Sequence, residues 1–326
     1  MMRVGFNPYG LAYTIGLTGA GTSRANPAPM GMAAFIDLAL EAGARCIELD
    51  GRWLTPRSGT ELTRVGRELH ASGVTTICSD WLTHVPGETL VRPIECAAAV
   101  GASLLRLHLT PVLEGARASW GERWPAIVAH ARRTLAAAAQ AASRVGLPLA
   151  IENHQDLTSE ELIAIADDLE GVGIVLDTGN PFAVGEDPLA FVARAGDRIR
   201  HVHLKDYVAQ FTAQGYRLVR CAIGDGCVPL AALAAVLPDG ITASIEPGAL
   251  EARHIRLFAP EWWLGYPPRD ASELATALGR LQTRRLSDDA DWRTPWEKRA
   301  PAEEVATYEL SQIRRSVENL GRMGWM

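Results

Sequence analysis

Cysteine is scarce in this sequence of 326 residues, and the few present form no metal-binding or disulfide pattern. The five are scattered, odd in number and include no C-x-x-C pair: Cys46, Cys78, Cys96, Cys221 and Cys227. A secreted disulfide scaffold needs paired cysteines, and a structural zinc site needs clustered thiolates, so both classes are excluded. This usage is typical of a reducing compartment, and we expect a cytoplasmic protein.

The sequence also lacks long apolar runs and basic blocks. No stretch reaches the roughly 18 apolar residues of a membrane-spanning helix, and the first residues contain no signal-peptide core. The 32 Lys and Arg residues are outnumbered by 38 Asp and Glu residues, which gives a net charge of −6. An acidic chain without a basic block is poorly suited to nucleic acid or an anionic membrane, so we expect neither as a partner.

Phosphate-binding glycine motifs are missing as well. No G-x-G-x-x-G follows the first strand-like run, and no loop carries the lysine of a P-loop, which argues against an open dinucleotide-binding sheet. Instead, short β-branched runs alternate with Ala-, Leu- and Arg-rich stretches of helical periodicity. The predicted strands are 3–7, 45–50, 75–80, 104–110, 148–153, 173–177, 198–205 and 242–246. This alternation predicts a parallel sheet, and eight repeats favour a closed (β/α)8 TIM barrel.

Two segments do not fit the repeat. Residues 8–31 form an unusually long connection after the first strand, where a loop at the barrel mouth is expected, and loops of this length are commonly functional. Residues 251–326 contain five of the nine tryptophans. We therefore expect a catalytic barrel over residues 1–250 and a C-terminal extension over residues 251–326 that makes oligomer or partner contacts.

Ionisable residues end four consecutive predicted strands. They are Glu152, Asp177, His203 and Glu246. TIM-barrel active sites form at the C-terminal strand ends, and strand alternation points each of these side chains inward. Three clustered carboxylates without a cation would repel one another. Oxygen ligands with one imidazole suit Mn²⁺ best, with Mg²⁺, Co²⁺ or Zn²⁺ as alternatives, so the sequence predicts one divalent metal here.

The motifs around these residues resemble those of the sugar phosphate isomerase/epimerase family, which are xylose-isomerase-like TIM barrels. The motifs are Ile-Glu-Asn-His, Leu-Asp-Thr-Gly-Asn, His-Val-His-Leu-Lys-Asp and Ile-Glu-Pro-Gly, in family order. The resemblance implies that Glu152, Asp177, His203 and Glu246 bind the metal and that the two glutamates exchange a substrate proton. It implies enolisation of a keto sugar. Asn180 departs from the family pattern, because some family epimerases have histidine there.

Further inward positions are candidates for catalysis. His154 lies on the same strand face as Glu152 and acts either as a base or as a residue that orients a carboxylate. Lys205 stabilises an enolate oxygen or neutralises Asp206, and His108 is a candidate proton donor or hydroxyl ligand. Glu48 and Asp80 also end strands, where they contact either substrate or loop amides. Four further histidines lie outside the predicted strands, and we expect them to be structural or to face solvent: His70, His84, His130 and His254.

The reaction that follows enolisation is either reprotonation or loss of a leaving group. The loop at 7–26 with Trp53 and Trp81 favours a mouth that stacks an aromatic group. The start Asn-Pro-Tyr-Gly-Leu and the aromatic tail resemble the catalytic α subunits of bacterial C-glycoside deglycosidases, which work with a small β subunit. That resemblance implies β-elimination from a 3-keto C-glycoside with release of the aglycone.

Three alternatives remain at this stage. A keto-sugar isomerase or 3-epimerase would reprotonate the enolate, and an inosose-type dehydratase would expel water. A metal-dependent endonuclease shares the barrel, but such enzymes use several metals and a basic groove. Because the ligand set fits one metal and the chain is acidic, the endonuclease is the least favoured of the three alternatives.

Overall fold

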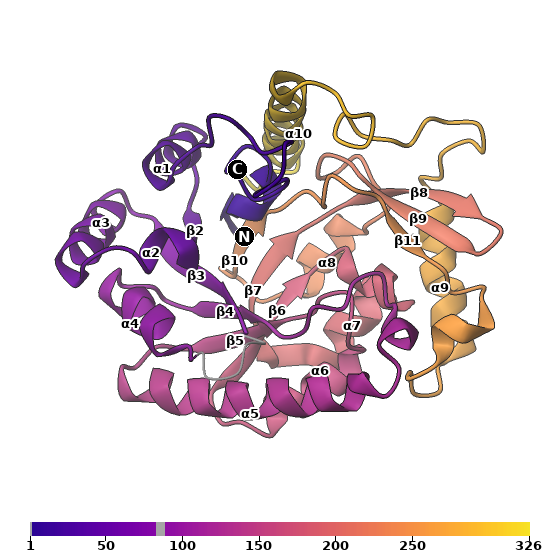
Figure 1. Ribbon diagram of the computed structural model, residues 1–326, viewed down its shortest axis with the longest axis horizontal. Coiled ribbons are helices and arrows are strands. Elements are labelled where there is room, and N and C mark those ends of the chain that lie inside the picture. Colours follow the sequence, from indigo (N-terminus) through magenta and orange to yellow (C-terminus); the bar gives the residue numbers. More distant parts are fainter. Residues whose placement is uncertain (1, 83–88) are drawn as a thin grey trace.

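The computed structural model describes residues 2–82 and 89–326, and its centre is a closed barrel of eight parallel strands (Figure 1). The barrel order is β1-β10-β7-β6-β5-β4-β3-β2. The strands are β1 (Arg3–Phe6), β2 (Cys46–Asp50), β3 (Thr75–Trp81), β4 (Leu105–His108), β5 (Leu149–Glu152), β6 (Val172–Asp177), β7 (Ile199–Leu204) and β10 (Thr242–Ile245). Each predicted strand forms one barrel strand, so the predicted (β/α)8 TIM barrel is confirmed.

Helices surround the barrel on its outside (Figure 1). Those that follow barrel strands are α1 (Met32–Glu41), α2 (Gly51–Leu54), α3 (Gly59–Ala71), α4 (Val91–Ala99), α5 (Arg123–Arg144), α6 (Ser159–Asp167), α7 (Pro188–Ala195) and α8 (Leu230–Val236). Capping boxes begin α3 at Ser58 and α6 at Thr158. Such caps satisfy backbone N–H groups that have no partner within the helix, and they set where each helix begins.

The barrel interior is apolar at one end and charged at the other. Ile77, Leu104, Ala150 and Val175 form a small apolar cluster of their own. One strand alternation further along, Glu152 follows Ala150 and Asp177 follows Val175 on the same faces, so charged side chains occupy the C-terminal end. This arrangement is what places the candidate site at the barrel mouth.

A second sheet, which the sequence did not reveal, lies beside the mouth. It is antiparallel in the order β11-β9-β8, with β8 (Tyr207–Thr212), β9 (Gly215–Arg220) and β11 (Arg253–Ile255). The strand β11 comes from the predicted C-terminal extension and pairs with β9, while β8 and β9 follow barrel strand β7 in the chain. The first residues of the extension are therefore already part of the structure beside the barrel mouth.

The last part of the extension holds the long loop after β1 in place. The helix α10 (Ala302–Arg322) packs against the short 3-10 helix η1 (Pro8–Leu11), while α9 (Ala271–Gln282) packs beside β8 (Figure 1). The buried carboxylate of Glu309 accepts hydrogen bonds from the backbone N–H groups of Tyr13 at 3.0 Å and Thr14 at 2.8 Å. The Arg220 guanidinium lies 3.7 Å from the Glu309 carboxylate, with which it forms an ion pair. It also donates a hydrogen bond to the Gly10 carbonyl at 2.7 Å.

Part of the aromatic cluster of the extension packs on its own chain, while Phe258 and Leu264 are exposed. The Trp262 indole is buried and donates to the Glu114 carbonyl at 3.0 Å, and the Tyr266 ring stacks on it with centroids 4.7 Å apart. The Arg117 guanidinium lies 4.0 Å from the Tyr266 ring. These aromatic residues cover the loop between β4 and α5. Among the described helices, none combines the length and apolarity that a membrane crossing requires.

Candidate metal centre and its cavity

The four predicted metal ligands converge at the C-terminal end of the barrel. Ligand atoms of Glu152, Asp177, His203 and Glu246 all lie within 4.8 Å of one another, and all four side chains are buried. The Nδ1 atom of His203 is 3.1 Å from Glu246 Oε2 and 3.3 Å from Glu152 Oε1. Three strands and the end of a fourth thus bring these residues to one point, as the sequence predicted.

Lys205 contacts two members of this group. Its Nζ atom lies 2.5 Å from Asp177 Oδ2 and 2.8 Å from Glu246 Oε1. Asp206 is instead bonded to backbone: its carboxylate accepts from the N–H groups of Gly224 and Gly226, at 3.0 and 2.9 Å, and of Val228 and Tyr207, each at 3.0 Å. The reading in which Lys205 only neutralises Asp206 is therefore wrong, and Lys205 belongs to the candidate site.

Sequence reasoning missed two residues that support the ligand group. The Arg106 guanidinium bridges Glu48 at 3.4 Å and Glu152 at 3.3 Å, and the Asn7 amide donates to Glu48 at 2.9 Å. Arg106 shares an inward strand face with His108, so parity was a signal that could have found it. Asn7 directly follows β1 and caps η1, so only the conformation of this loop determines where its side chain points.

Glu48, expected to contact either substrate or loop amides, instead contacts the predicted histidine ligand. The His203 Nε2 atom lies 3.0 Å from Glu48 Oε2, and Glu48 is fully buried. Burial opposes ionisation of Glu48, but His203, His201 and Arg106 hold its pKa well below the usual value. An anionic Glu48 at Nε2 leaves Nδ1 of His203 facing the other carboxylates, which is the arrangement of metal-binding histidines.

The charges of the buried residues at the ligand group show whether a metal cation fits there. The buried carboxylates are Glu48, Glu152, Asp177 and Glu246, and the cations paired with them are Arg106 and Lys205. With His203 neutral, as a metal-binding imidazole must be, two negative charges remain, and one divalent cation would neutralise them. Glu246 Oε2 is moreover buried, and its contact among the described residues is the ion-pair contact with His203 Nδ1, which does not have hydrogen-bond geometry. Oxygen-rich ligands with one imidazole suit a cation such as Mn²⁺, so the residues fit the expected metal.

A cavity of about 420 Å³ opens onto the ligand group. Glu152, Lys205 and Glu246 line its base. Its wall includes a row of rings in which His108 lies between Trp81, with centroids 4.2 Å apart, and His154, at 4.0 Å. The Trp81 indole also donates to the Tyr9 hydroxyl at 2.8 Å. The loop after β1 thus supplies part of the cavity through Tyr9, as its length and position predicted.

His154 is held as a neutral ring. Burial lowers its pKa to about 3, and its Nδ1 atom has no hydrogen-bond partner among the described residues. Lys205 and Arg253 lower the same pKa, whereas Glu152 raises it. The buried ring therefore stays uncharged at neutral pH, and its Nδ1 atom can form a hydrogen bond with a ligand in the cavity.

Several other candidates lie apart from the cavity. Trp53 packs on Phe35, with ring centroids 5.4 Å apart, and does not line the mouth as Trp81 does. Asp80 accepts a hydrogen bond from the Trp81 backbone N–H at 2.7 Å and is not part of the cavity wall. His254 contacts Thr212 at 3.0 Å. His84 lies outside the described residues.

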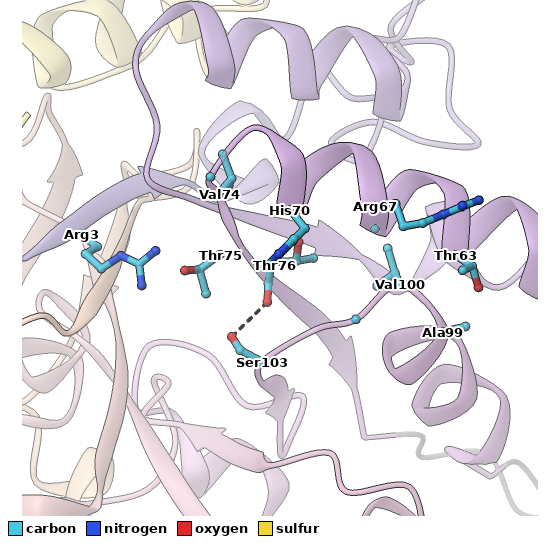
Figure 2. Close-up of a pocket in the computed structure, with 13 residues that line it drawn as sticks. Arg3, Thr63, Arg67, His70, Val74, Thr75, Thr76, Ala99, Val100 and Ser103 are labelled. Carbon is cyan, nitrogen blue, oxygen red and sulfur yellow. Dashed lines mark hydrogen bonds between the residues drawn. The ribbon is translucent and has the colours of Figure 1, made fainter.

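A larger cavity, of about 560 Å³, lies at the opposite end of the barrel (Figure 2). It is lined by Arg3, Thr75 and Thr76 at strand beginnings and by residues of α3 and α4, among them His70. The Ser103 hydroxyl donates to the Thr76 carbonyl at 3.1 Å. Neither the four predicted ligands nor a second candidate group of the described residues, Glu48 with His201 and His203, borders this cavity. The smaller cavity at the C-terminal end is therefore the candidate active site.

Comparisons with known proteins agree with this architecture. The model of a family described as "Xylose isomerase-like TIM barrel" matches residues 36–256. The structure is similar to that of the probable 3-DHS dehydratase AsbF from Bacillus anthracis, with a TM-score of 0.54, 14% identity and coverage of 75% of this chain and 92% of that one. It is also similar to D-allulose 3-epimerase from Methylomonas sp., with a TM-score of 0.54, 17% identity and coverage of 97% and 98%.

A curated relative matches a shorter stretch. The uncharacterized protein YihM of Escherichia coli (strain K12) is 30% identical over 90 residues, which cover 27% of this chain and 28% of that protein. The match thus spans little more than a quarter of the relative's length. At their low identities, the two solved structures establish the fold alone.

Proposed function

The chain belongs to the xylose isomerase-like TIM barrel family, and we propose that it is a divalent-metal-dependent enzyme that enolises a keto sugar. The observation that carries this proposal is the group of Glu152, Asp177, His203 and Glu246, which lacks two positive charges and opens onto a cavity. Two of its carboxylates line that cavity, where a substrate carbon can reach them. We take cytoplasmic keto sugars or keto glycosides as the substrate class.

The metal would be held by the four ligands, with Glu48 and Arg106 fixing two of them. When bound, a divalent cation would stabilise the negative charge that develops on the substrate oxygens as the α-proton leaves. Mn²⁺ is our first choice because of the oxygen-rich ligand set.

Proton transfer falls to the glutamates in this proposal. Arg106 and His203 overcome the effect of burial and hold the pKa of Glu152 well below its usual value, so Glu152 stays ionised. Glu246 lies at the cavity base beside the Lys205 ammonium. We assign the removal and return of the α-proton to these two carboxylates. Lys205, the neutral ring of His154 and the ring of His108 then contact the substrate oxygens.

Within this class, our specific proposal is β-elimination from a 3-keto C-glycoside. The C2 proton passes to a glutamate, its electron pair forms the C1–C2 double bond as the C1–aglycone bond breaks, and the aglycone carbon takes up a proton. The rings of Tyr9 and Trp81 support this choice, because they offer an aromatic aglycone a stacking wall at the cavity. A small β subunit or a second copy of the chain would complete such an enzyme.

Reprotonation of the same intermediate gives the second candidate, an isomerase or 3-epimerase, and expulsion of water gives a dehydratase. The same residues and cavity would carry out the first half of each reaction. The Asn180 side chain supports elimination over epimerisation in our proposal. It is buried and donates to the Asn153 carbonyl at 3.0 Å, so no imidazole is available at this position for a substrate hydroxyl.

One experiment separates these outcomes. The Mn²⁺-loaded protein is incubated in D₂O with a 3-keto C-glucoside and, separately, with free ketoses. Aglycone release supports the lyase, whereas deuterium incorporation with a new sugar isomer supports the epimerase. Glu246→Gln, checked for bound metal, should abolish both. Undiminished activity of this variant would contradict the enolisation scheme, and metal-independent activity would contradict the role of the ligand group.

A further inference from the structure

Arg253 differs from the other cations that line the cavity. Arg52 is paired with Asp50 at 2.5 Å, Arg106 with Glu48 and Glu152, and Lys205 with Asp177 and Glu246. Arg253 forms no ion pair with any described carboxylate, and its buried Nε atom has no hydrogen-bond partner among the described residues. A buried guanidinium nitrogen without a partner is unfavourable unless a ligand satisfies it.

The position of Arg253 is set by the second sheet. It is the first residue of β11 and pairs with Leu218 of β9. The next residue, His254, directs its side chain to Thr212 on β8, 3.0 Å away, and strand alternation sends Arg253 to the other side. On that side Arg253 lines the same cavity as Glu246 and His154.

The neighbouring carboxylate in the cavity wall is engaged elsewhere. Glu251 also lines the cavity, but its Oε1 atom accepts a hydrogen bond from the Trp296 indole at 2.6 Å. The ligand group needs one divalent cation for neutrality, so a loaded site contributes no surplus negative charge that Arg253 could balance. The positive charge of Arg253 is therefore directed at the contents of the cavity.

We infer that Arg253 is a subsite for an anionic oxygen group, such as a carboxylate, carried by the keto-sugar substrate. The planar guanidinium offers paired N–H donors that match a carboxylate or a phosphate oxygen pair. This inference rests on the proposed function for the identity of the reacting sugar, and it adds the charge of the substrate. Arg253 is a specificity residue that binds substrate away from the metal ligands.

Two matched sugars test the inference. 5-Keto-D-gluconate has the carbon skeleton and stereochemistry of L-sorbose, with a carboxylate in place of the hydroxymethyl group farthest from the ketone. Their dissociation constants are measured by calorimetry on the Mn²⁺-loaded full chain at fixed ionic strength. We expect the acid to bind about tenfold more tightly or better, since hydrogen bonds between charged groups are the stronger class.

Variants identify the residue responsible. Arg253→Gln should lose the preference for the acid without changing the affinity for L-sorbose, and Arg253→Lys should retain part of it. Arg217→Gln is the matched control: it removes a charge from the same sheet, but Arg217 lies over the Trp292 ring at 4.7 Å and does not line the cavity. This variant should keep the full preference.

Two results would overturn the inference: no preference for the acid in the wild-type protein, or a preference that survives Arg253→Gln. Measuring solvent deuterium exchange on the same sugars keeps the two proposals separable. A preference that follows Arg253 supports the subsite even if neither sugar exchanges a proton. Exchange without any preference leaves the proposed function standing and removes the subsite.

Discussion

The Nε2 atom of His203 lies 3.0 Å from Oε2 of Glu48, a carboxylate outside the predicted ligand set. One edge of the imidazole is thus committed to Glu48, and the other edge faces Glu152 and Glu246. A hydrogen bond from Nε2–H to Glu48 fixes both the tautomer and the ring orientation that a metal at Nδ1 requires. The candidate centre is therefore supported from β2, a strand that contributes none of the four predicted ligands.

Glu48→Gln should weaken binding of Mn²⁺ by about tenfold or more, because partners that orient a metal ligand have effects of that order. The substitution keeps a hydrogen-bond acceptor but removes the buried charge. Calorimetric titration of the metal-free protein measures the effect. Glu68→Gln, at an exposed carboxylate on α3, is the control and should bind metal like the wild type. Equal affinities for both variants would show that Glu48 does not support the centre.

Removing the metal should lower the thermal stability of the protein. Chelation removes both charges of the cation from the buried carboxylates, and a proton on His203 restores only one of them. A ligand present at 100 times its Kd stabilises a folded protein by about 2.7 kcal/mol. The transition temperature is compared with EDTA, with Mn²⁺ and with Mn²⁺ after EDTA. Asp177→Asn removes one of the excess charges and should reduce the difference. If Mn²⁺ does not change the transition temperature of the wild-type protein, this result would argue against a divalent metal at the ligand group.

Metal affinity should rise with pH. Burial alone would lower the pKa of His203, but Glu48, Glu246 and Glu152 raise it well above its usual value, so the metal-free protein holds a proton there. A metal must displace this proton, and below the raised pKa the apparent affinity should fall by about tenfold per pH unit. The same proton stabilises the metal-free fold fully below the unfolded pKa, and this stabilisation is lost as pH rises through the folded pKa.

Calorimetry of Mn²⁺ binding between pH 6 and 8, in buffers of different ionisation enthalpy, measures both the affinity and the protons released. Asp177, whose pKa burial raises to about 6, adds to the competition at the acidic end of this range. Affinity that stays constant across the range, without proton release, would contradict the prediction.

His154→Gln should reduce the rate of α-proton exchange by about tenfold, the effect of one lost hydrogen bond. Burial lowers the pKa of His154 to about 3, so the ring is neutral, and we assign it a hydrogen bond to the substrate rather than removal of the proton. Glu246→Gln should instead cost at least about 10²-fold, as expected for loss of a general base. Exchange is measured in D₂O at saturating Mn²⁺, with metal content determined for each variant. If His154→Gln proved as damaging as Glu246→Gln, the base would be His154.

Glu309→Ala should destabilise the protein by about 3 kcal/mol, because it leaves the buried Arg220 without its carboxylate and two backbone N–H groups without an acceptor. Since those N–H groups belong to the loop that carries Tyr9, the KM for substrate should rise more than kcat falls. Urea unfolding and steady-state kinetics give the two effects. Glu304→Ala, at an exposed position on the same helix, should change neither.

Local sequence patterns predicted the barrel and the four candidate metal ligands. The period of two along each strand assigns Glu152, His203 and Lys205 to inward faces, and the alternation of strands and helices predicts that these strand ends meet. The small β11-β9-β8 sheet was missed because β8 and β9 follow β7 without a helical segment between them, so the strand–helix alternation gave no signal there.

The residue sequence by itself thus determined the architecture and the four candidate ligands, because strand parity and chain order suffice for both. Only the tertiary structure decided which side chains support them. Glu48 and His203 lie 155 positions apart, and closure of the barrel brings them to 3.0 Å. The same closure pairs Lys205 with Asp177, and among the described residues it leaves Arg253 in the cavity wall without a carboxylate partner. Pairings of this kind depend on the positions of whole strands and on charge balance in a buried space, and no local pattern encodes either.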